Sequence, residues 1–290
     1  MERSYELKPI VLGKIWRDGG ALHYLTFYGQ QGWLPVTMWY IKGADTPILV
    51  DTGGPAKEFP KYIPMPAEDI ISFEKALAAE GLRPEDIGLV ICTHLHYDHV
   101  LNIRECINAR MVVQKAELDF ALSPHPLFAH LYDATMAEEL PFETVEGDVE
   151  LLAGIKLHHF GGHTPGSQGV AVRTHQGQAV ISGMCTTQKN FDPPLGVAHT
   201  PVLGRGIQAR RLGRLADDEA ATPGRRLGQR SVRGQHESQS QHEEYQFFHN
   251  DPSLCKKVRV VWHPTQRFAS AGALLRGRVP QEHTYAVTHS

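Results

Sequence analysis

The sequence predicts a layered α/β sandwich, and three observations support this fold class. Short runs rich in β-branched and aromatic residues recur along the chain and are bounded by Gly and Pro, which is typical of strands. One long segment instead has a helical period. Strands follow one another before and after this helix, whereas a doubly wound parallel sheet alternates strands with helices. We find no internal repeat.

The first predicted elements are two strands and a helix. The strands cover 33–43 and 46–54 and are joined by a turn at "GADTP". The helix covers 66–87 and stops near Gly81 and Pro84. Its apolar residues recur at near-helical spacing: Ile70, Phe73, Leu77 and Leu82.

Four further elements follow the helix. The apolar run 88–93, "GLVICT", predicts a buried strand, and 108–118 predicts a strand that runs into a helix. We expect a strand pair over 149–161. The segment 169–183 predicts a hairpin that turns at "HQGQ".

The composition argues against several classes of partner. The chain has 290 residues, a net charge of -3, 41% hydrophobic and 21% charged residues, so no overall charge favours nucleic acid or a membrane surface. No apolar run reaches the roughly 18 residues of a membrane span, and the amino terminus lacks a signal-peptide hydrophobic block. The cysteines form no CxxC pair and no disulfide-like framework, which favours a reducing cytoplasm: Cys92, Cys106, Cys185 and Cys255.

Histidine is unusually frequent, with 17 residues, and it clusters in "THLHYDH" at 93–99. His94 and His96 are two residues apart, so both rings project to the same side of an extended chain. Asp98 and His99 follow where the chain turns toward the next helix. Imidazoles and a carboxylate suit Zn²⁺, with Mn, Fe or Co as alternatives. The alternative interpretation is a polar loop that caps the helix beginning near Asp98.

A catalytic zinc typically holds three protein ligands and a water, so a further ligand is required. His163 is the best candidate, because it lies between a Gly pair and a Thr-Pro-Gly turn that lets the backbone bring its ring close to the site. The alternative is a turn histidine without a ligand role. We interpret His158 and His159, which precede the turn on a predicted strand, mainly as structural residues.

These motifs carry a family resemblance. "VDTGG" (50–54), "THLHYDH" (93–99) and "GGHTPGS" (161–167), in this order and at this spacing, resemble the metallo-β-lactamase superfamily. Within it, the sequence looks most like the N-acyl homoserine lactonase-type hydrolases. The resemblance covers roughly residues 5–200.

The resemblance implies an αββα sandwich with the metals at one edge of the paired sheets. Residues 1–200 would form the catalytic domain, and 201–290 would be an atypical C-terminal segment in place of the part that normally completes the same domain. Site residues are also implied. One metal would be held by His94, His96 and His163, a second by Asp98, His99 and a C-terminal His, with Asp51 as a buried acid close to the site.

The sequence departs from the family pattern at the second metal. The bridging Asp of the family aligns with Gly183, and an aromatic hydroxyl three residues further on aligns with Thr186. The terminal His ligand has two candidates, His249 and His263, and we choose neither. We therefore expect one or two Zn²⁺ ions per chain.

The resemblance implies a metal-dependent hydrolase that opens a lactone, with N-acyl homoserine lactones as the first candidate substrate. The metal activates a water molecule as nucleophile. Asp98 is the predicted catalytic residue, which orients this nucleophile and passes its proton to the leaving alkoxide. The alternatives are a thioesterase of the glyoxalase II type and a non-catalytic or degenerate relative with an incomplete metal site. We expect a small-molecule substrate, with no nucleic-acid or membrane partner; the sequence does not indicate the oligomeric state.

The segment 204–246 has sparse aliphatic residues and no sustained period, and arginine replaces lysine in it. Such a composition does not build a core and favours disorder. We weigh three interpretations: a basic arm for nucleic acid, a poorly packed insertion, and a stretch translated out of its evolved reading frame, which we favour. Trypsin is expected to cut first within this segment.

Overall fold

Two facing β-sheets form the centre of the protein, which we describe from a computed structural model. The structure describes residues 3–22, 27–183 and 246–247. One sheet has seven strands in the order β4-β1-β2-β3-β5-β6-β7, and the other has five in the order β12-β11-β10-β9-β8. The strands of the first sheet are β1 (Glu6–Asp18), β2 (Gln31–Lys42), β3 (Ile48–Val50), β4 (Ala67–Asp69), β5 (Leu89–Ile91), β6 (Arg110–Gln114) and β7 (Phe142–Val145). Those of the second are β8 (Val149–Leu152), β9 (Ile155–His159), β10 (Gln168–Thr174), β11 (Gly177–Ile181) and β12 (Gln246–Phe247).

The helices among the described residues are short. The α-helices are α1 (Gly19–Leu22), α2 (Phe73–Ala78), α3 (Tyr97–Val100), α4 (Lys115–Leu122) and α5 (Ala134–Glu139). The 3₁₀ helices span Ala56–Lys61, Pro84–Asp86, Leu101–Glu105 and Ala129–Leu131.

Strand pairing divides the seven-stranded sheet into two parts. β1 and β2 form a long antiparallel pair, and β2 also pairs antiparallel with β3. From β3 the pairing continues parallel through β5, β6 and β7. The carboxyl ends of β3, β5 and β6 therefore lie at one edge of the sheet, which is where functional loops gather in α/β proteins.

Alternation along the strands explains why both faces of this sheet are buried. In β3, Ile48 and Val50 point into the core between the sheets, where Leu157 and Val170 of the second sheet also lie. Leu49 points to the opposite face and packs in a cluster with Leu77 of α2. Successive side chains of a strand face opposite sides, so the three consecutive apolar residues of β3 pack into two separate hydrophobic clusters.

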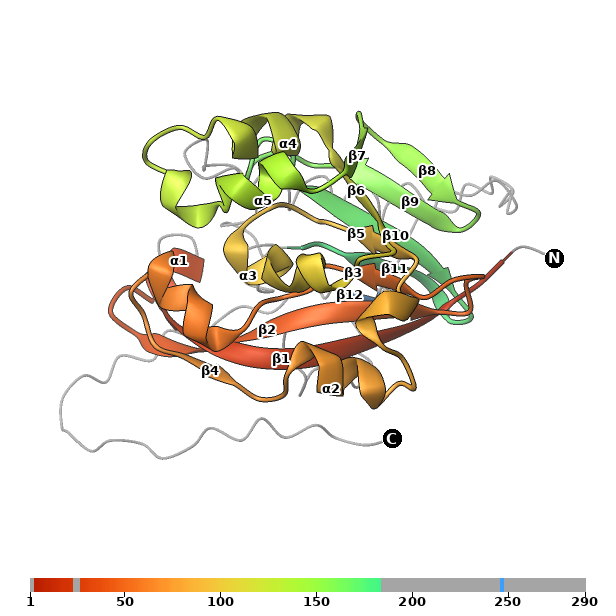
Figure 1. Ribbon diagram of the computed structural model, residues 1–290, viewed down its shortest axis with the longest axis horizontal. Coiled ribbons are helices and arrows are strands. Elements are labelled where there is room, and N and C mark those ends of the chain that lie inside the picture. Colours follow the sequence, from red (N-terminus) through yellow and green to blue (C-terminus); the bar gives the residue numbers. More distant parts are fainter. Residues whose placement is uncertain (1–2, 23–26, 184–245, 248–290) are drawn as a thin grey trace, which may run out of the picture.

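The helices formed by the described residues lie on one side of the seven-stranded sheet. In Figure 1, α2, α3 and α5 lie on one side of it, and β10 and β11 lie on the other. The described residues thus form three layers, one helical layer and two sheets, of the αββα sandwich that the sequence predicts. The outer face of the five-stranded sheet carries no helix formed by the described residues.

The predicted helix over 66–87 is wrong at both ends. Residues Ala67–Asp69 form β4, which pairs with Gly13–Ile15 of β1, and only Phe73–Ala78 are α-helical. Ser72 caps this helix by accepting a hydrogen bond from the Lys75 amide, so the helix begins there. Ile70, one of the apolar residues whose spacing predicted the longer helix, lies before the cap and is 60% exposed.

Other predicted elements are confirmed. The segments 33–43, 46–54 and 88–93 contain strands, and 108–118 is a strand followed by a helix. The 149–161 pair and the 169–183 hairpin are antiparallel pairs, β8 with β9 and β10 with β11. Of the predicted segment 201–290 the structure describes only Gln246 and Phe247, which pair with β11, so the predictions for 204–246 otherwise fall outside the described residues.

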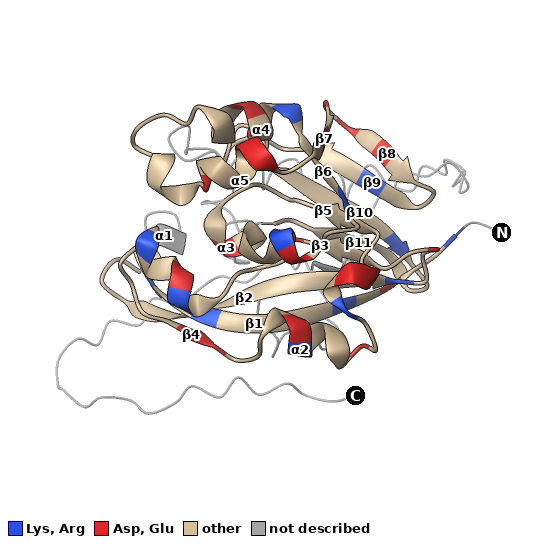
Figure 2. Ribbon diagram, viewed as in Figure 1, with Lys and Arg blue, Asp and Glu red and all other residues tan. Residues whose placement is uncertain are grey.

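Charge is spread over the described elements. Figure 2 shows acidic and basic residues interspersed along the ribbon, without a stripe of one sign across the described part. Within that part, none of the helices has the length and apolar character needed to cross a bilayer.

Candidate metal centre

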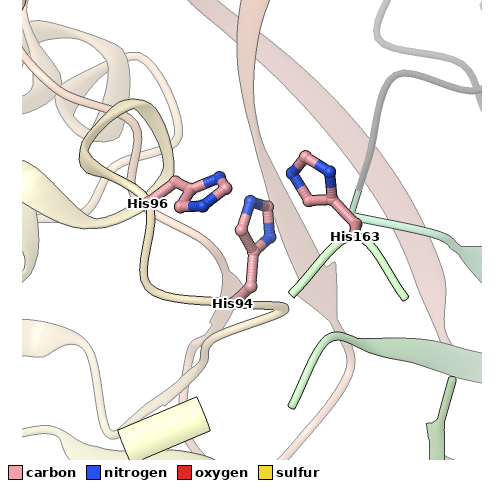
Figure 3. Close-up of side chains that lie close together, drawn as sticks. All are labelled: His94, His96 and His163. Carbon is pink, nitrogen blue, oxygen red and sulfur yellow. The ribbon is translucent and has the colours of Figure 1, made fainter. Parts of the chain in front are cut away.

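Three imidazole rings converge at the edge where β5 ends. His94, His96 and His163 each bring a ring nitrogen to within 4.8 Å of the others'. The ring centroids of His94 and His96 are 4.7 Å apart, and those of His96 and His163 are 4.8 Å apart. Figure 3 shows the three rings directed toward one another from two separate parts of the chain. This convergence matches the donor set of a three-histidine metal site.

The first two histidines lie between β5 and α3. His94 is 1% and His96 7% exposed, and His96 is the N-cap of α3 with an extended backbone. The buried strand therefore ends in a short extended segment, and the helix begins directly after the second ring. This matches the prediction that the two rings project to one side.

The third histidine lies on a tight loop between β9 and β10. Gly161 and Gly162 have positive φ values of 64° and 98°, which the backbone needs in order to turn there. The amides of Phe160 and Gly161 both donate to the Ser167 carbonyl and close the loop. The Gln168 amide donates to the Thr93 carbonyl at 2.9 Å, so the two histidine-bearing segments are joined directly.

Hydrogen bonds define which nitrogen of His94 is free to bind a metal. The Thr93 hydroxyl donates its proton to Asp51 Oδ2 at 2.7 Å, so its oxygen accepts from His94 Nδ1 at 3.1 Å. His94 Nε2 then carries a lone pair. This nitrogen is buried and has no hydrogen-bond partner among the described residues. A buried lone pair without a donor fits a metal ligand, since buried polar atoms are otherwise almost always paired.

The electrostatics also favour neutral imidazoles. Burial, followed by repulsion from the neighbouring histidines, holds the pKa of both His94 and His96 well below the ordinary value. Both rings are therefore unprotonated at neutral pH and offer lone pairs. Metal ligation by histidine requires this neutral form.

Asp51 is hydrogen-bonded to the residues just before and just after the histidine segment, Thr93 and His99. It accepts hydrogen bonds from the Thr93 amide and from His99 Nδ1, both at 2.7 Å. Burial alone lowers the pKa of His99, but the charges of Asp51 and Asp98 raise it to about 9. Asp51 itself has a φ of 58°, an uncommon conformation for a residue with a side chain and one that Asp tolerates better than most.

Of the five predicted ligands, the structure brings three histidines together. His94, His96 and His163 form the converging group, which among the described residues includes neither Asp98 nor His99. His99 is nevertheless close, with its ring centroid 4.0 Å from that of His94. Asp98 lies in the first turn of α3. The roles of Asp98 and His99 remain predictions.

Gly183, at the position of the expected bridging Asp, lies against Thr93. A Cβ added there would meet the Thr93 Cβ at 2.1 Å, and the φ of Gly183 is 67°. A side chain at 183 would therefore require Thr93 or the backbone around it to shift. Thr186, His249 and His263 fall outside the described residues.

Sequence reasoning missed Glu117, a fully buried acid in α4. Burial raises its pKa, while hydrogen bonds from Thr164, Leu95 and Gly166 oppose that rise. Its only signal in the sequence is its place four residues before the buried Ala121 on the same helix face. A single acid at that spacing is indistinguishable from a solvent-facing charge.

Comparison with known proteins gives the same family as the motifs. The family model of the metallo-beta-lactamase superfamily matches residues 31–185. An N-acyl homoserine lactonase of Bacillus sp is 30% identical over 198 residues, which cover 62% of this chain and 76% of the relative. The N-acyl homoserine lactonase AiiB of Agrobacterium fabrum is 30% identical over 195 residues, covering 58% and 71%.

Solved structures show the same architecture. A quorum-quenching N-acyl homoserine lactone lactonase matches with a TM-score of 0.63 at 25% identity, covering 76% of this chain and 91% of the other. An N-acyl homoserine lactone hydrolase with N-hexanoyl-L-homoserine bound at its catalytic metal centre also has a TM-score of 0.63, at 24% identity and the same coverage. At such identities the likeness to this second structure is one of fold.

Proposed function

Since the chain belongs to the metallo-beta-lactamase superfamily, we propose that it is a metal-dependent hydrolase that opens a lactone ring, with N-acyl homoserine lactones as the first substrates to test. The observation that carries the proposal is the buried Nε2 of His94, which has no hydrogen-bond partner in the described part of the chain and faces the rings of His96 and His163. The similarity to N-acyl homoserine lactonases supports the lactone as substrate. Opening such lactones would make the protein a quorum-quenching enzyme.

In the proposed mechanism His94, His96 and His163 would hold the metal, with Zn²⁺ first and Mn, Fe or Co as alternatives. When bound, a divalent metal would supply Lewis-acid chemistry at the water and the ester carbonyl. The other groups belong to the chain. A carboxylate oxygen of Asp98 takes the proton that the attacking water loses and returns it to the ring oxygen when the C–O bond breaks. The product is a hydroxy acid.

A side-chain nucleophile is not required by this mechanism. Cys92, which follows β5 next to the histidine segment, is fully buried in the core, and burial holds the pKa of its thiol well above the ordinary value. Cys92 and Cys106 are free and buried, which supports a reducing compartment, and we propose the cytoplasm.

The test is turnover of a lactone panel by the metal-loaded protein. We expect ring opening of N-acyl homoserine lactones, its loss on chelation and its return with Zn²⁺, Co²⁺ or Mn²⁺. His163→Ala should abolish turnover, whereas His175→Ala, at an exposed position in the β10–β11 turn, should not. Thioester cleavage without lactone turnover would move the assignment to a glyoxalase II-type activity.

A further inference from the structure

Glu117 contacts both histidine-bearing segments at once. Its Oε1 accepts from the amide of Leu95, the residue between His94 and His96, at 2.9 Å. Its Oε2 accepts from the hydroxyl of Thr164, which follows His163, and from the Gly166 amide at 3.1 Å. One carboxylate therefore joins the segment after β5 to the loop before β10.

The Glu117 side chain is fully buried, and among the described residues hydrogen-bond donors reach both of its oxygens. The Tyr132 hydroxyl adds a fourth hydrogen bond to Oε1 at 3.4 Å, and the Tyr132 ring packs edge-on against His96 with centroids 5.0 Å apart. Two amides and two hydroxyls facing one carboxyl group match an ionised carboxylate that accepts through both oxygens. A neutral amide in its place would direct its NH₂ group at donors.

Close packing fixes the loop against the same helix. A Cβ added to Gly166 would meet the Glu117 backbone nitrogen at 2.1 Å, so only Gly brings the loop this near to α4. Thr164 is 4% exposed. The distance between His163 and the other two histidines is thus tied to the position of one side chain.

We propose that Glu117 is a positioning residue that sets the separation between His163 and the His94–His96 pair, and thereby the affinity and geometry of the metal site. This rests on the proposed metal site. Mutating a residue that hydrogen-bonds directly to a metal-binding side chain typically changes metal affinity about 10- to 100-fold. Glu117 does not hydrogen-bond to the histidine side chains themselves. It bonds to residues next to them in the chain, Leu95, Thr164 and Gly166.

The test compares Glu117→Gln with Asp119→Asn in full-length protein. Asp119 is an exposed acid of the same helix, paired with Lys115, so its variant removes the same charge without touching either loop. The readouts are Co²⁺ affinity by competition with a chromogenic chelator, the visible absorption spectrum of bound Co²⁺, and thermal unfolding of the metal-free protein.

Glu117→Gln should bind Co²⁺ about tenfold more weakly or worse, with a changed spectrum. Asp119→Asn should match wild type. Thr164→Val, which removes one of the donors and keeps the shape, should shift affinity and spectrum in the same direction by less; it decides the question if Glu117→Gln does not fold.

Two results would overturn the proposal, and they differ. If the variants lose thermal stability while their Co²⁺ affinity and spectrum match wild type, Glu117 is only structural and the metal site stands. If wild type itself binds no Co²⁺, the metal site and the proposed hydrolase function fall together with the role of Glu117.

Discussion

Thr93 joins His94 to Asp51 through a single hydroxyl group, which donates to the carboxylate and accepts from the ring. This arrangement holds His94 in the tautomer whose Nε2 faces the other two histidines. Without the hydroxyl, either tautomer of the ring is accessible, and Asp51 loses one of its donors.

Thr93→Val should therefore weaken metal binding by about tenfold and lower the free energy of unfolding by about 1–3 kcal/mol. Chelator competition and urea denaturation measure the two effects. Thr144→Val, at an exposed position of β7, is the control and should change neither. Equal metal affinity in wild type and Thr93→Val would show that the hydroxyl does not select the tautomer.

Gly183 allows a second test at the scale of one residue, because its Cβ position overlaps Thr93 and its φ is positive. Gly177 also has a positive φ, of 116°, but open space around its Cβ position. Gly183→Ala should cost more stability than Gly177→Ala by about 1–3 kcal/mol, the cost of forcing a methyl group into packed surroundings. Denaturant titrations of both variants give the difference; similar losses would mean that the Thr93 contact relaxes freely.

At the scale of elements, Glu80 joins the chain just after α2 to two strands. Its side chain is 5% exposed and pairs with Lys8 of β1 and Lys42 of β2. The hydrogen bond from Lys8 is the main reason that the pKa of Glu80 lies below its usual range, with burial opposing it. The carboxylate thus holds the helical layer against the β1–β2 pair.

A lowered folded-state pKa means that Glu80 stabilises the fold above the unfolded pKa of about 4.3, and that this contribution disappears as pH falls through the lower folded value. Glu80→Gln should cost about 1 kcal/mol at pH 7, since the lysines are partly exposed. Its stability should also fall less than that of wild type between pH 5 and pH 3 (roughly the window in which the carboxylate is protonated). Glu143→Gln, which breaks the exposed pair with Arg110, is the control. Parallel pH profiles for wild type and Glu80→Gln would contradict this assignment.

The sequence predicted best those elements whose own residues carry a clear local pattern. The β10–β11 hairpin follows from the apolar residues on either side of a turn that contains Gly. The strand that ends before His94 follows from its buried apolar run, although its partners β3 and β6 are distant in sequence. The segment 66–72 does not, because its apolar spacing satisfies a helix while its backbone pairs with β1, far away in sequence. β1 itself was not predicted, although it is a long strand of the first sheet.

The residues of the site also divide into those that local motifs predict and those that only the folded chain brings together. His94, His96 and His163 follow from motifs, because their spacing and flanking Gly residues are visible in the sequence. Glu117 was missed because its partners Leu95 and Thr164 come from two other segments, and only the folded chain brings the three together. Two of its donors are backbone amides, which almost every residue has, so no residue type in the sequence marks them.

At the scale of the whole molecule, a bound metal would connect the two sheets. His94 and His96 follow β5 of the seven-stranded sheet, and His163 precedes β10 of the five-stranded sheet. Metal that binds only the folded chain stabilises it by about 4 kcal/mol at a free concentration roughly 1,000 times the dissociation constant.

Zn²⁺ should therefore raise the melting temperature of wild type by about 10 °C under such conditions. His96→Ala should show almost no shift, and His175→Ala the full shift. Scanning calorimetry with and without a chelator measures this. A Zn²⁺ shift that survives in His96→Ala would place the metal elsewhere.

Because the three rings come from both sheets, the site should form late in folding. A polypeptide that has assembled only its first sheet holds two of the three converging rings, and the third arrives when β9 and β10 dock. Contacts between distant segments form late in folding, since their loop must close first. During refolding, the absorbance of bound Co²⁺ should therefore rise after the far-ultraviolet ellipticity, which reports secondary structure, has recovered. The delay between the two signals would measure how late the two sheets dock.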